Sequence, residues 1–260
     1  IELRMGLYFA NQMDKLKLLS EGVDLYKDFA SSVFGVPYDE VNDDQRFIGK
    51  TSQLSLIYGV GAAKLRAAIF AGSRKDIGEY MAKNIVELYR HEYSYVAQSW
   101  AEGTLALEHI REDYYYTFGL NKSLQLPVHG DNGIELPSGL FMRFPDMRQS
   151  YNDYGKLEWT YAQHKKRVAI HGAKCFQNTI QALARCIMGE AMVRIHKTYP
   201  VALTIHDAVY CVVPEEQAEK ALRDIIIEMR CPPTWAPGIV LDAEGGYGKN
   251  LSFKMKKVAV

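Results

Sequence analysis

Apolar residues recur at helical spacing in three long stretches of the chain. Spacings of three and four residues predict helices within residues 1–34, 76–118 and 167–198. The first stretch ends at Gly35 and Pro37, residue types that stop a helix. The sequence therefore predicts a large helical part.

Two other stretches have the short apolar runs and central turn residues of β-hairpins. In residues 132–145 the runs flank a Pro-Ser-Gly turn, and in residues 201–216 they flank a polar His-Asp pair. A helix over 215–230 would cover one face of the second hairpin, and residues 238–248 would add a strand. A sheet with helices on one side and a helical insertion is an α+β fold.

A stripe of side chains at a step of four appears in "QRFIGKTSQLSLIYG". It consists of Arg46, Lys50, Leu54 and Tyr58, and the preceding "NDDQ" supplies the capping and acidic residues of a helix start. Residues four apart share a helix face, and this stripe is about 18 Å long at the helical rise. Arg46 and Lys50 suit the phosphates of a nucleoside triphosphate, and Tyr58 suits a base. A surface helix with two ordinary cations has the same spacing, so spacing alone leaves both interpretations open.

An aspartate between two apolar strands is costly unless it is solvated, paired or bound to a metal. Asp207 occupies such a position, directly after His206. A single carboxylate at the tip of a hairpin suits Mg²⁺, which takes one or two carboxylates together with substrate phosphates. Aspartate is also common in tight turns, so a structural turn residue is the alternative.

Composition and charge limit the classes of protein that remain. With 260 residues, 48% of them hydrophobic, the chain can build a large core and two subdomains. Lys and Arg number 31, as do Asp and Glu, so the net charge of zero gives no global support for nucleic-acid binding. The local basic clusters are "HKKR" (164–167) and "KMKK" (254–257), for which a solvated surface is the alternative.

The cysteine pattern argues against a zinc site. None of the four cysteines forms a Cys-x-x-Cys pair, and a reducing, cytosolic context is expected. The sequence shows no signal peptide and no apolar run of membrane-spanning length, so no membrane partner is expected.

Three segments together resemble the polymerase motifs of the family A DNA polymerases. "IELR" (1–4), "RFIGKTSQLSLIYG" (46–59) and "IHDAV" (205–209) occur in the order of the three motifs. The second motif reads Arg-x-x-x-Lys-x-x-x-(Phe, Tyr or Leu)-x-x-x-Tyr-Gly, which the chain matches completely. The phrases "LPSGLFMRFP" and "HGAKCFQNTIQALAR" are most similar to the phage branch of the family. The resemblance covers nearly the whole chain.

The resemblance implies the palm of a right-hand polymerase, with an antiparallel sheet, a helical fingers insertion and no thumb. Residues 1–10 would begin the palm, 11–160 would form the fingers, and 161–260 would complete the palm with the His-Asp hairpin. The implied activity is template-directed addition of deoxynucleotides to a primer 3′ end by two-metal phosphoryl transfer, in DNA replication or repair.

The resemblance also assigns roles in nucleotide binding. Arg46 and Lys50 would bind the triphosphate, and Lys50 would give a proton to the leaving pyrophosphate. Leu54 stands where an aromatic residue often packs on the sugar, so altered handling of 3′-modified sugars is expected. Tyr58 would stand at the nascent base pair. Glu2 would be a steric gate that bonds Tyr58 and blocks a ribose 2′-hydroxyl.

The DNA and metal roles follow in the same way. Asp207 would be one of two carboxylates that hold two Mg²⁺ ions. His206 would support the primer terminus, and Gln177 would contact the minor groove, where the acceptors common to all base pairs report geometry. Arg4 would also contact DNA. Primer–template DNA, deoxynucleoside triphosphates and a replication accessory protein are the implied partners, in the cytoplasm of a bacterial or phage-infected cell.

Two departures from the family pattern affect the metal site. The first motif normally begins Asp-x-Ser-Gln, and the chain starts at the following Ile1, so the isolated piece is expected to be inactive. Ala208 stands where a glutamate usually follows His-Asp, which puts the metal affinity in doubt.

Two other functions fit parts of the pattern. Single-subunit RNA polymerases share the palm and a similar helix, but Glu2 argues against them because they need room for the 2′-hydroxyl. An inactive polymerase-like module that binds DNA or a replication partner is motivated by Ala208 and the missing aspartate. Sugar selectivity and an upstream Asp-x-Ser-Gln sequence would separate these alternatives.

Overall fold

The computed structural model describes residues 1–112 and 114–250, and the backbone alone of 256–257. In this part of the chain the helices are α1 (Glu2–Phe9), α2 (Met13–Ser20), α3 (Leu25–Phe34), α4 (Asp43–Leu56), α5 (Ala62–Ser73), α6 (Gly78–Glu92), α7 (Ser94–Glu112), α8 (Gly172–His196) and α9 (Ala218–Arg230), with 3₁₀ turns η1 (Tyr38–Glu40) and η2 (Glu215–Gln217). The strands are β1 (Tyr116–Phe118), β2 (Leu126–His129), β3 (Gly133–Glu135), β4 (Phe141–Met142), β5 (Arg148–Tyr151), β6 (Leu157–Gln163), β7 (Lys166–Ile170), β8 (Val201–Ile205), β9 (Ala208–Cys211), β10 (Gly246–Tyr247) and β11 (Lys256–Lys257). The expected α+β class is confirmed.

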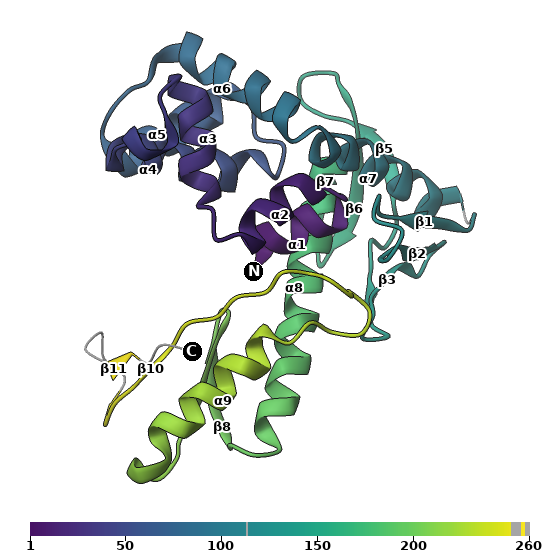
Figure 1. Cartoon of the computed structure of the whole chain (residues 1–260). Helices are drawn as coiled ribbons and strands as arrows, with labels where there is room; N and C mark the ends of the chain where they lie inside the picture. The colour runs from purple at the N-terminus through teal and green to yellow at the C-terminus, as the bar shows by residue number, and fades with distance from the viewer. Residues whose placement is uncertain (113, 251–255, 258–260) are drawn as a thin grey trace.

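The described strands form several small antiparallel sheets rather than one continuous sheet. Strands β1 to β4 make one sheet in chain order, and β5 to β7 make a second. Strands β8 and β9 form a hairpin, and β10 pairs with β11. Helix α8 runs through the middle of the molecule and connects the helical part to the β8–β9 hairpin and α9 (Figure 1).

The hairpins and the late helix are confirmed where the sequence predicts them. The hairpin expected over 132–145 is formed by β3 and β4, and the one over 201–216 by β8 and β9. The helix expected over 215–230 is formed by η2 and α9. Short apolar runs with central turn residues were therefore a sufficient local signal for these elements.

The helical prediction is wrong at two places. Residues 116–118 belong to β1 and residues 166–170 belong to β7, both of which pair with a neighbouring strand. A short apolar run looks alike in a strand and in a buried helix turn, so its pairing partner decides the outcome.

The strand expected over 238–248 is also largely wrong, since only Gly246–Tyr247 pairs with another strand. The preceding residues instead lie against α1. The Tyr8 hydroxyl donates to the Pro237 carbonyl at 2.6 Å, and Arg4 donates to the Val240 carbonyl at 3.1 Å. Hydrogen bonds from α1 side chains thus hold this segment in place of backbone pairing with another strand.

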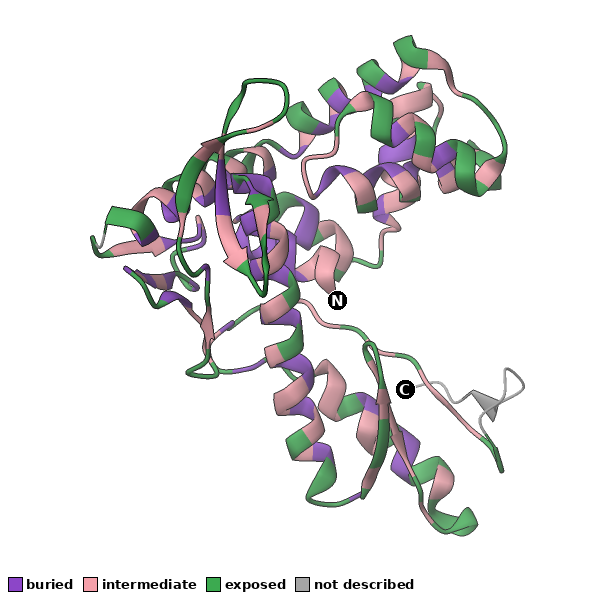
Figure 2. Ribbon diagram, turned by 180° about the vertical axis from the view of Figure 1, so that it is seen from behind, coloured by how far each residue is buried: buried purple, intermediate pink, exposed green. Residues whose placement is uncertain are grey.

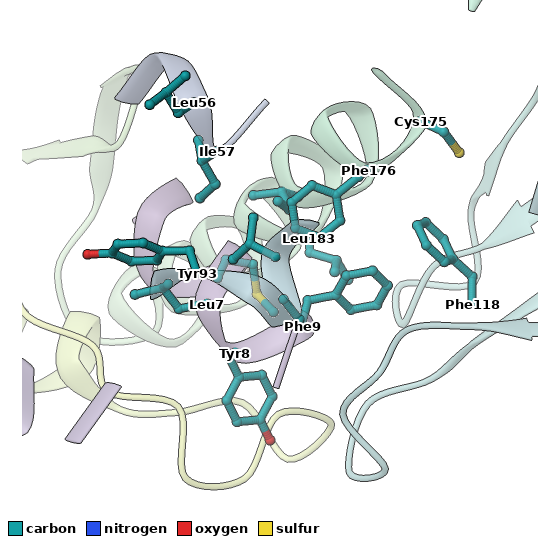
Figure 3. Close-up of a cluster of buried hydrophobic side chains, with 14 of the residues drawn as sticks. Leu7, Tyr8, Phe9, Leu56, Ile57, Tyr93, Phe118, Cys175, Phe176 and Leu183 are labelled. Carbon is teal, nitrogen blue, oxygen red and sulfur yellow. The ribbon is translucent and has the colours of Figure 1, made fainter. Parts of the chain in front are cut away.

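The largest core lies where α1 meets α8 and the β1–β4 sheet. The Phe9 ring meets Phe118 edge to face at 5.0 Å and lies 6.1 Å from Phe176 (Figure 3). Ile57, from the turn after α4, reaches into the same cluster. Buried residues gather in this upper half of the molecule (Figure 2). The core therefore fixes α1 and the end of α4 against α8.

Of the two basic clusters, "HKKR" can be placed, and its lysines lie at the surface. In "HKKR", Arg167 donates to an Asp146 carboxylate oxygen at 2.5 Å and to Thr160, while Lys165 and Lys166 are exposed. Residues 254 and 255 of "KMKK" lie outside the described residues. Within the described range, no helix is both long and apolar enough to cross a bilayer.

Candidate active site

Helix α4 begins where the sequence predicts and ends slightly earlier. Its start is fixed by a capping box, in which Asn42 and Gln45 exchange two bonds of 3.0 Å between side chain and backbone. The helix ends at Leu56, so Tyr58 lies in the turn that follows. Gly59 closes this turn at φ 71°, and a Cβ there would lie 2.6 Å from the Cβ of Ala173. The end of α4 is therefore pressed against the start of α8.

Arg46 and Lys50 converge on Tyr26 of the neighbouring helix α3. The guanidinium lies 5.8 Å and the ammonium 5.9 Å from the centre of the Tyr26 ring. Arg46 also donates to an Asp24 carboxylate oxygen at 2.6 Å. These contacts hold both cations near one face of α4, where Lys50 and Leu54 are exposed to solvent.

Asp24 and Tyr26 were missed by the sequence reasoning. Asp24 caps α3, because its side chain accepts from the backbone N–H of Tyr26 at 2.9 Å and of Lys27 at 3.3 Å. An aspartate before an apolar run signals such a cap. It does not signal that the same carboxylate also holds Arg46 from another helix.

Glu2 and Tyr58 meet although 56 positions separate them in the sequence. The Tyr58 hydroxyl donates to a Glu2 carboxylate oxygen, as the resemblance implied. Burial, and then the Glu2 carboxylate, raise the pKa of Tyr58 far above its ordinary value, so the hydroxyl keeps its proton. Close packing allows the contact, since a Cβ on Gly6 of α1 would lie 2.7 Å from the Ile57 side chain.

His206 and Asp207 form the two-residue connection between β8 and β9, with Ile205 and Ala208 paired on either side. His206 has a φ of 53°, in the left-handed region that glycine or asparagine would enter at lower cost. Both side chains are exposed. Strained turn residues that persist in a fold gather at functional sites, so the turn is a candidate site as well as a connection.

Asp207 lies at a small cavity of about 60 Å³ that Ile1, Arg4 and Asp242 also line. Asp207 has no hydrogen bond or ion pair to the described residues. The Asp242 carboxylate is occupied, with Arg230 at 3.1 Å and Arg4 at 3.7 Å. The cavity thus brings the first and third motifs together and offers one uncommitted carboxylate.

The two remaining predicted DNA contacts lie apart from one another. Arg4 is turned toward the segment after α9, through its bonds to the Val240 carbonyl and the Asp242 carboxylate. Gln177 lies on α8, where its side-chain oxygen accepts from Lys174 at 3.0 Å. Neither contact tests a role in binding DNA, so both roles stay predictions.

The described residues contain no cluster of three or more His, Cys, Asp or Glu side chains placed to hold a metal ion. Asp207 still fits one part of a magnesium site, because Mg²⁺ is often held by one or two carboxylates plus substrate phosphates. The donor is a hard oxygen that is exposed to solvent.

Similarity to known proteins covers almost the whole chain. A family model described as DNA polymerase family A matches residues 1–252. The chain belongs to DNA polymerase family A. The three motifs that converge at Glu2, Tyr58 and Asp207 therefore sit within a family A domain.

Two curated family A relatives align with nearly the full chain. "DNA polymerase I, thermostable" of Thermus thermophilus is 25% identical over 257 residues, 96% of this chain and 26% of the relative. DNA polymerase I of Pseudomonas aeruginosa is 25% identical over 258 residues, 96% of this chain and 24% of the relative. The chain therefore spans about a quarter of the length of these relatives.

A solved family structure has the same fold. It is the POL domain of Pol1 from M. smegmatis, described as a complex with DNA primer-template and dNTP. The TM-score is 0.61 at 19% identity, over 94% of this chain and 36% of the other. At this identity the likeness supports the fold, including the palm and fingers architecture expected from the sequence.

Proposed function

We propose that this chain is part of a template-directed DNA polymerase, which adds deoxynucleotides to a primer 3′ end in replication or repair. The observation that carries the proposal is the convergence of three distant motifs. Glu2 bonds Tyr58, and Asp207 lines the cavity at Ile1. Primer–template DNA and deoxynucleoside triphosphates are the proposed substrates, and a replication accessory protein is a proposed partner. The DNA and dNTP in the complex of the M. smegmatis relative support the substrates.

The cations of α4 would bind the triphosphate. Arg46 and Lys50 lie one turn apart on the same side of α4, which suits contacts to successive phosphates. As the primer 3′-oxygen bonds to the α-phosphorus, the bond to the β-phosphate oxygen breaks and pyrophosphate leaves. Lys50 would donate a proton to that leaving group. Leu54, 41% exposed on the same helix, would lie near the sugar without stacking on it.

The pair Glu2–Tyr58 would select the sugar and test the base pair. Because Tyr58 donates its hydroxyl to Glu2, the carboxylate is held in place at the site. A ribose 2′-hydroxyl would have to displace this arrangement, so deoxyribose is favoured. The tyrosine ring would lie against the nascent base pair.

Asp207 would hold Mg²⁺ together with the substrate phosphates and a second carboxylate of the complete enzyme. When bound, two such ions stabilise the attacking and the leaving oxygens of an in-line displacement. Ala208 directly follows Asp207 and begins β9, and its side chain gives no oxygen ligand. The metal affinity is therefore proposed to rest on Asp207 more heavily than in relatives with glutamate at this place.

His206 would support the primer terminus from the same turn, and Gln177 and Arg4 would contact the DNA. We also propose the division into palm (1–10), fingers (11–160) and palm (161–260). Strand β6 runs across the second boundary and ties the two parts together. The cytoplasm of a bacterial or phage-infected cell is the proposed place of action.

Primer extension tests this function on the longest natural reading frame that contains the chain. The assay uses Mg²⁺ and four deoxynucleotides, with an Asp207→Asn variant beside the wild type. The expected result is extension by the wild type and loss of extension in the variant, which keeps the size of the side chain but not its charge. Extension that survives the variant would refute the role of Asp207.

The 260-residue piece alone is proposed to be inactive. Among the described residues that line the cavity at Ile1, Asp207 is the one carboxylate that forms no ion pair with a side chain, and two-metal transfer requires more ligands. An RNA polymerase would use ribonucleotides at least as readily as deoxynucleotides, and the Glu2–Tyr58 bond argues against that. A folded full-length protein that binds primed DNA but does not extend it would support an inactive module.

A further inference from the structure

Three lysines from separate parts of the chain lie around the start of α8. Lys64 lies on α5, Lys156 lies between β5 and β6, and Lys174 lies in the first turn of α8. All three are exposed, and none forms an ion pair with the described residues. Other surface cations are paired with carboxylates, as Lys83 is with Glu79 at 2.6 Å. The lysine patch (Lys64, Lys156 and Lys174) is therefore an unneutralised positive surface.

The strand register brings Lys156 to this place. In the β5–β7 sheet Trp159 of β6 pairs with Ile170 of β7. Residues before Trp159 therefore extend beyond Ile170, beside His171, which caps α8. The turn between β6 and β7, with Lys165 and Lys166, lies at the opposite end of the same sheet.

Packing brings Lys64 there as well. Gly59 is pressed against Ala173, so the chain that continues into α5 starts beside the first turn of α8. The electrostatics of His171 agree with this placement. Burial lowers the pKa of His171 most, and the charges of Lys174, Lys64 and Lys156 lower it further. Lys174 also faces the positive end of the α8 dipole, an unfavourable place for a cation unless an anion joins it.

The β5–β6 turn is closed by hydrogen bonds and presents aromatic rings. The Asn152 side chain accepts from the backbone N–H of both Tyr154 and Lys156 at 3.0 Å, and Gly155 takes a left-handed φ of 72°. Tyr154 is 94% exposed and Tyr151 is 75% exposed. Asp153 is exposed in the same turn. Exposed rings beside cations are suited to stacking on the bases of a single strand.

We propose that the β5–β6 hairpin tip and the lysine patch bind the unpaired template strand ahead of the nascent base pair. This inference rests on the proposed polymerase function. Phosphates would lie on Lys64, Lys156 and Lys174, and an unpaired base would stack on Tyr154. Duplex DNA fits less well, because its paired bases do not expose a face for stacking. The patch adjoins Gly59, directly after Tyr58, so it lies next to the proposed base-pair site.

The test compares two DNA ligands on the longest natural reading frame that contains the chain. One is a primer–template with a single-stranded 5′ template overhang, and the other is a blunt duplex with the same paired length. Binding is measured by fluorescence anisotropy over a range of salt concentrations. The test variant is Tyr154→Ala with Lys156→Ala, and the matched control is Lys165→Ala with Lys166→Ala at the other end of the sheet.

The test variant is expected to weaken binding of the overhang DNA by about 5- to 160-fold, the range for loss of one stacked base. Its salt slope should fall by about 0.7, as expected for one phosphate contact to a single strand. Blunt duplex binding should be unchanged, and the control variant should bind both ligands like the wild type. All changed residues are exposed, and a thermal melt checks that each variant is folded.

Three results would overturn the inference. They are equal loss on both ligands, no loss on either, and an equal loss in the control variant. Primer extension by the wild type is measured in parallel. If the wild type extends primers and the variant still binds the overhang normally, only the role of the hairpin fails. If the wild type binds neither DNA, the polymerase proposal fails with it.

Discussion

The α3–α4 unit and the β8–β9 hairpin both carry residues of the proposed active site, yet they are held in different ways. Phe29 beneath α4 is fully buried and meets Tyr89 and Tyr93 edge to face, at 5.8 and 5.9 Å. The hairpin packs on a small cluster of buried residues, while Leu203 and Ile205 on β8 are 44% and 46% exposed. Figure 2 shows the same contrast between the upper and lower halves of the molecule.

This difference fits the proposed tasks of the two regions. The cations of α4 must meet several phosphates at once, so the helix needs a packed base that fixes its direction. Gly49 allows that packing, because a Cβ there would lie 2.2 Å from the Tyr26 carbonyl oxygen. Asp207 is placed by the register and turn of one hairpin, which backbone hydrogen bonds can fix without a large core.

The two regions should differ most in how much stability is lost when an apolar side chain is truncated. Phe29→Ala should lower the free energy of unfolding by about 3–5 kcal/mol, since it empties a fully buried aromatic site. Leu203→Ala on β8 should cost less than about 1 kcal/mol, because much of that side chain is already in water. Urea unfolding of both variants measures the two values. Similar costs would refute the contrast between the regions.

An intermediate effect is expected at Asp24, which both caps α3 and holds Arg46. Asp24→Ala should lower the free energy of unfolding by about 1 kcal/mol, the usual cost of losing an N-cap. Asp24→Asn keeps the capping acceptor and loses the charge, and the half-exposed Arg46 pair adds little, so its cost should be under about 0.5 kcal/mol. Thermal or urea unfolding measures both variants. Equal costs would mean that the ion pair matters more than the cap.

The smallest effect at neutral pH concerns the protonation of Tyr58. The pKa of Tyr58 is raised in the folded state. Its contribution to the free energy of unfolding is therefore fully present below the ordinary pKa of 10.0 and is lost as the pH rises above that value. Above pH 10, Tyr58→Phe should therefore lose about 1.4 kcal/mol less stability per pH unit than the wild type, the share of one proton. Urea unfolding at several pH values between 9 and 11 measures the slopes. Identical slopes would mean that Tyr58 ionises as easily in the folded protein as in the unfolded chain.

Local sequence signals predicted the parts of the site that lie on single elements. The Asn42–Gln45 capping box, the stripe on α4 and the His-Asp turn each follow from residues within a few positions of one another. The strands β5 to β7 were not predicted, because their short apolar runs have no distinctive period and their partners lie elsewhere in the chain. The role of Arg4 in binding the segment after α9 was missed for the same reason.

The sequence by itself determined the α+β class, the family and the order of the three motifs. Only the tertiary structure decided that Asp24 and Tyr26 hold the α4 cations and that Arg4 binds the segment after α9. The physical reason is range. Caps, turns and periodicity act between neighbours in the chain, whereas these contacts depend on how α1, α3, α4 and the segment after α9 pack, which no short segment encodes.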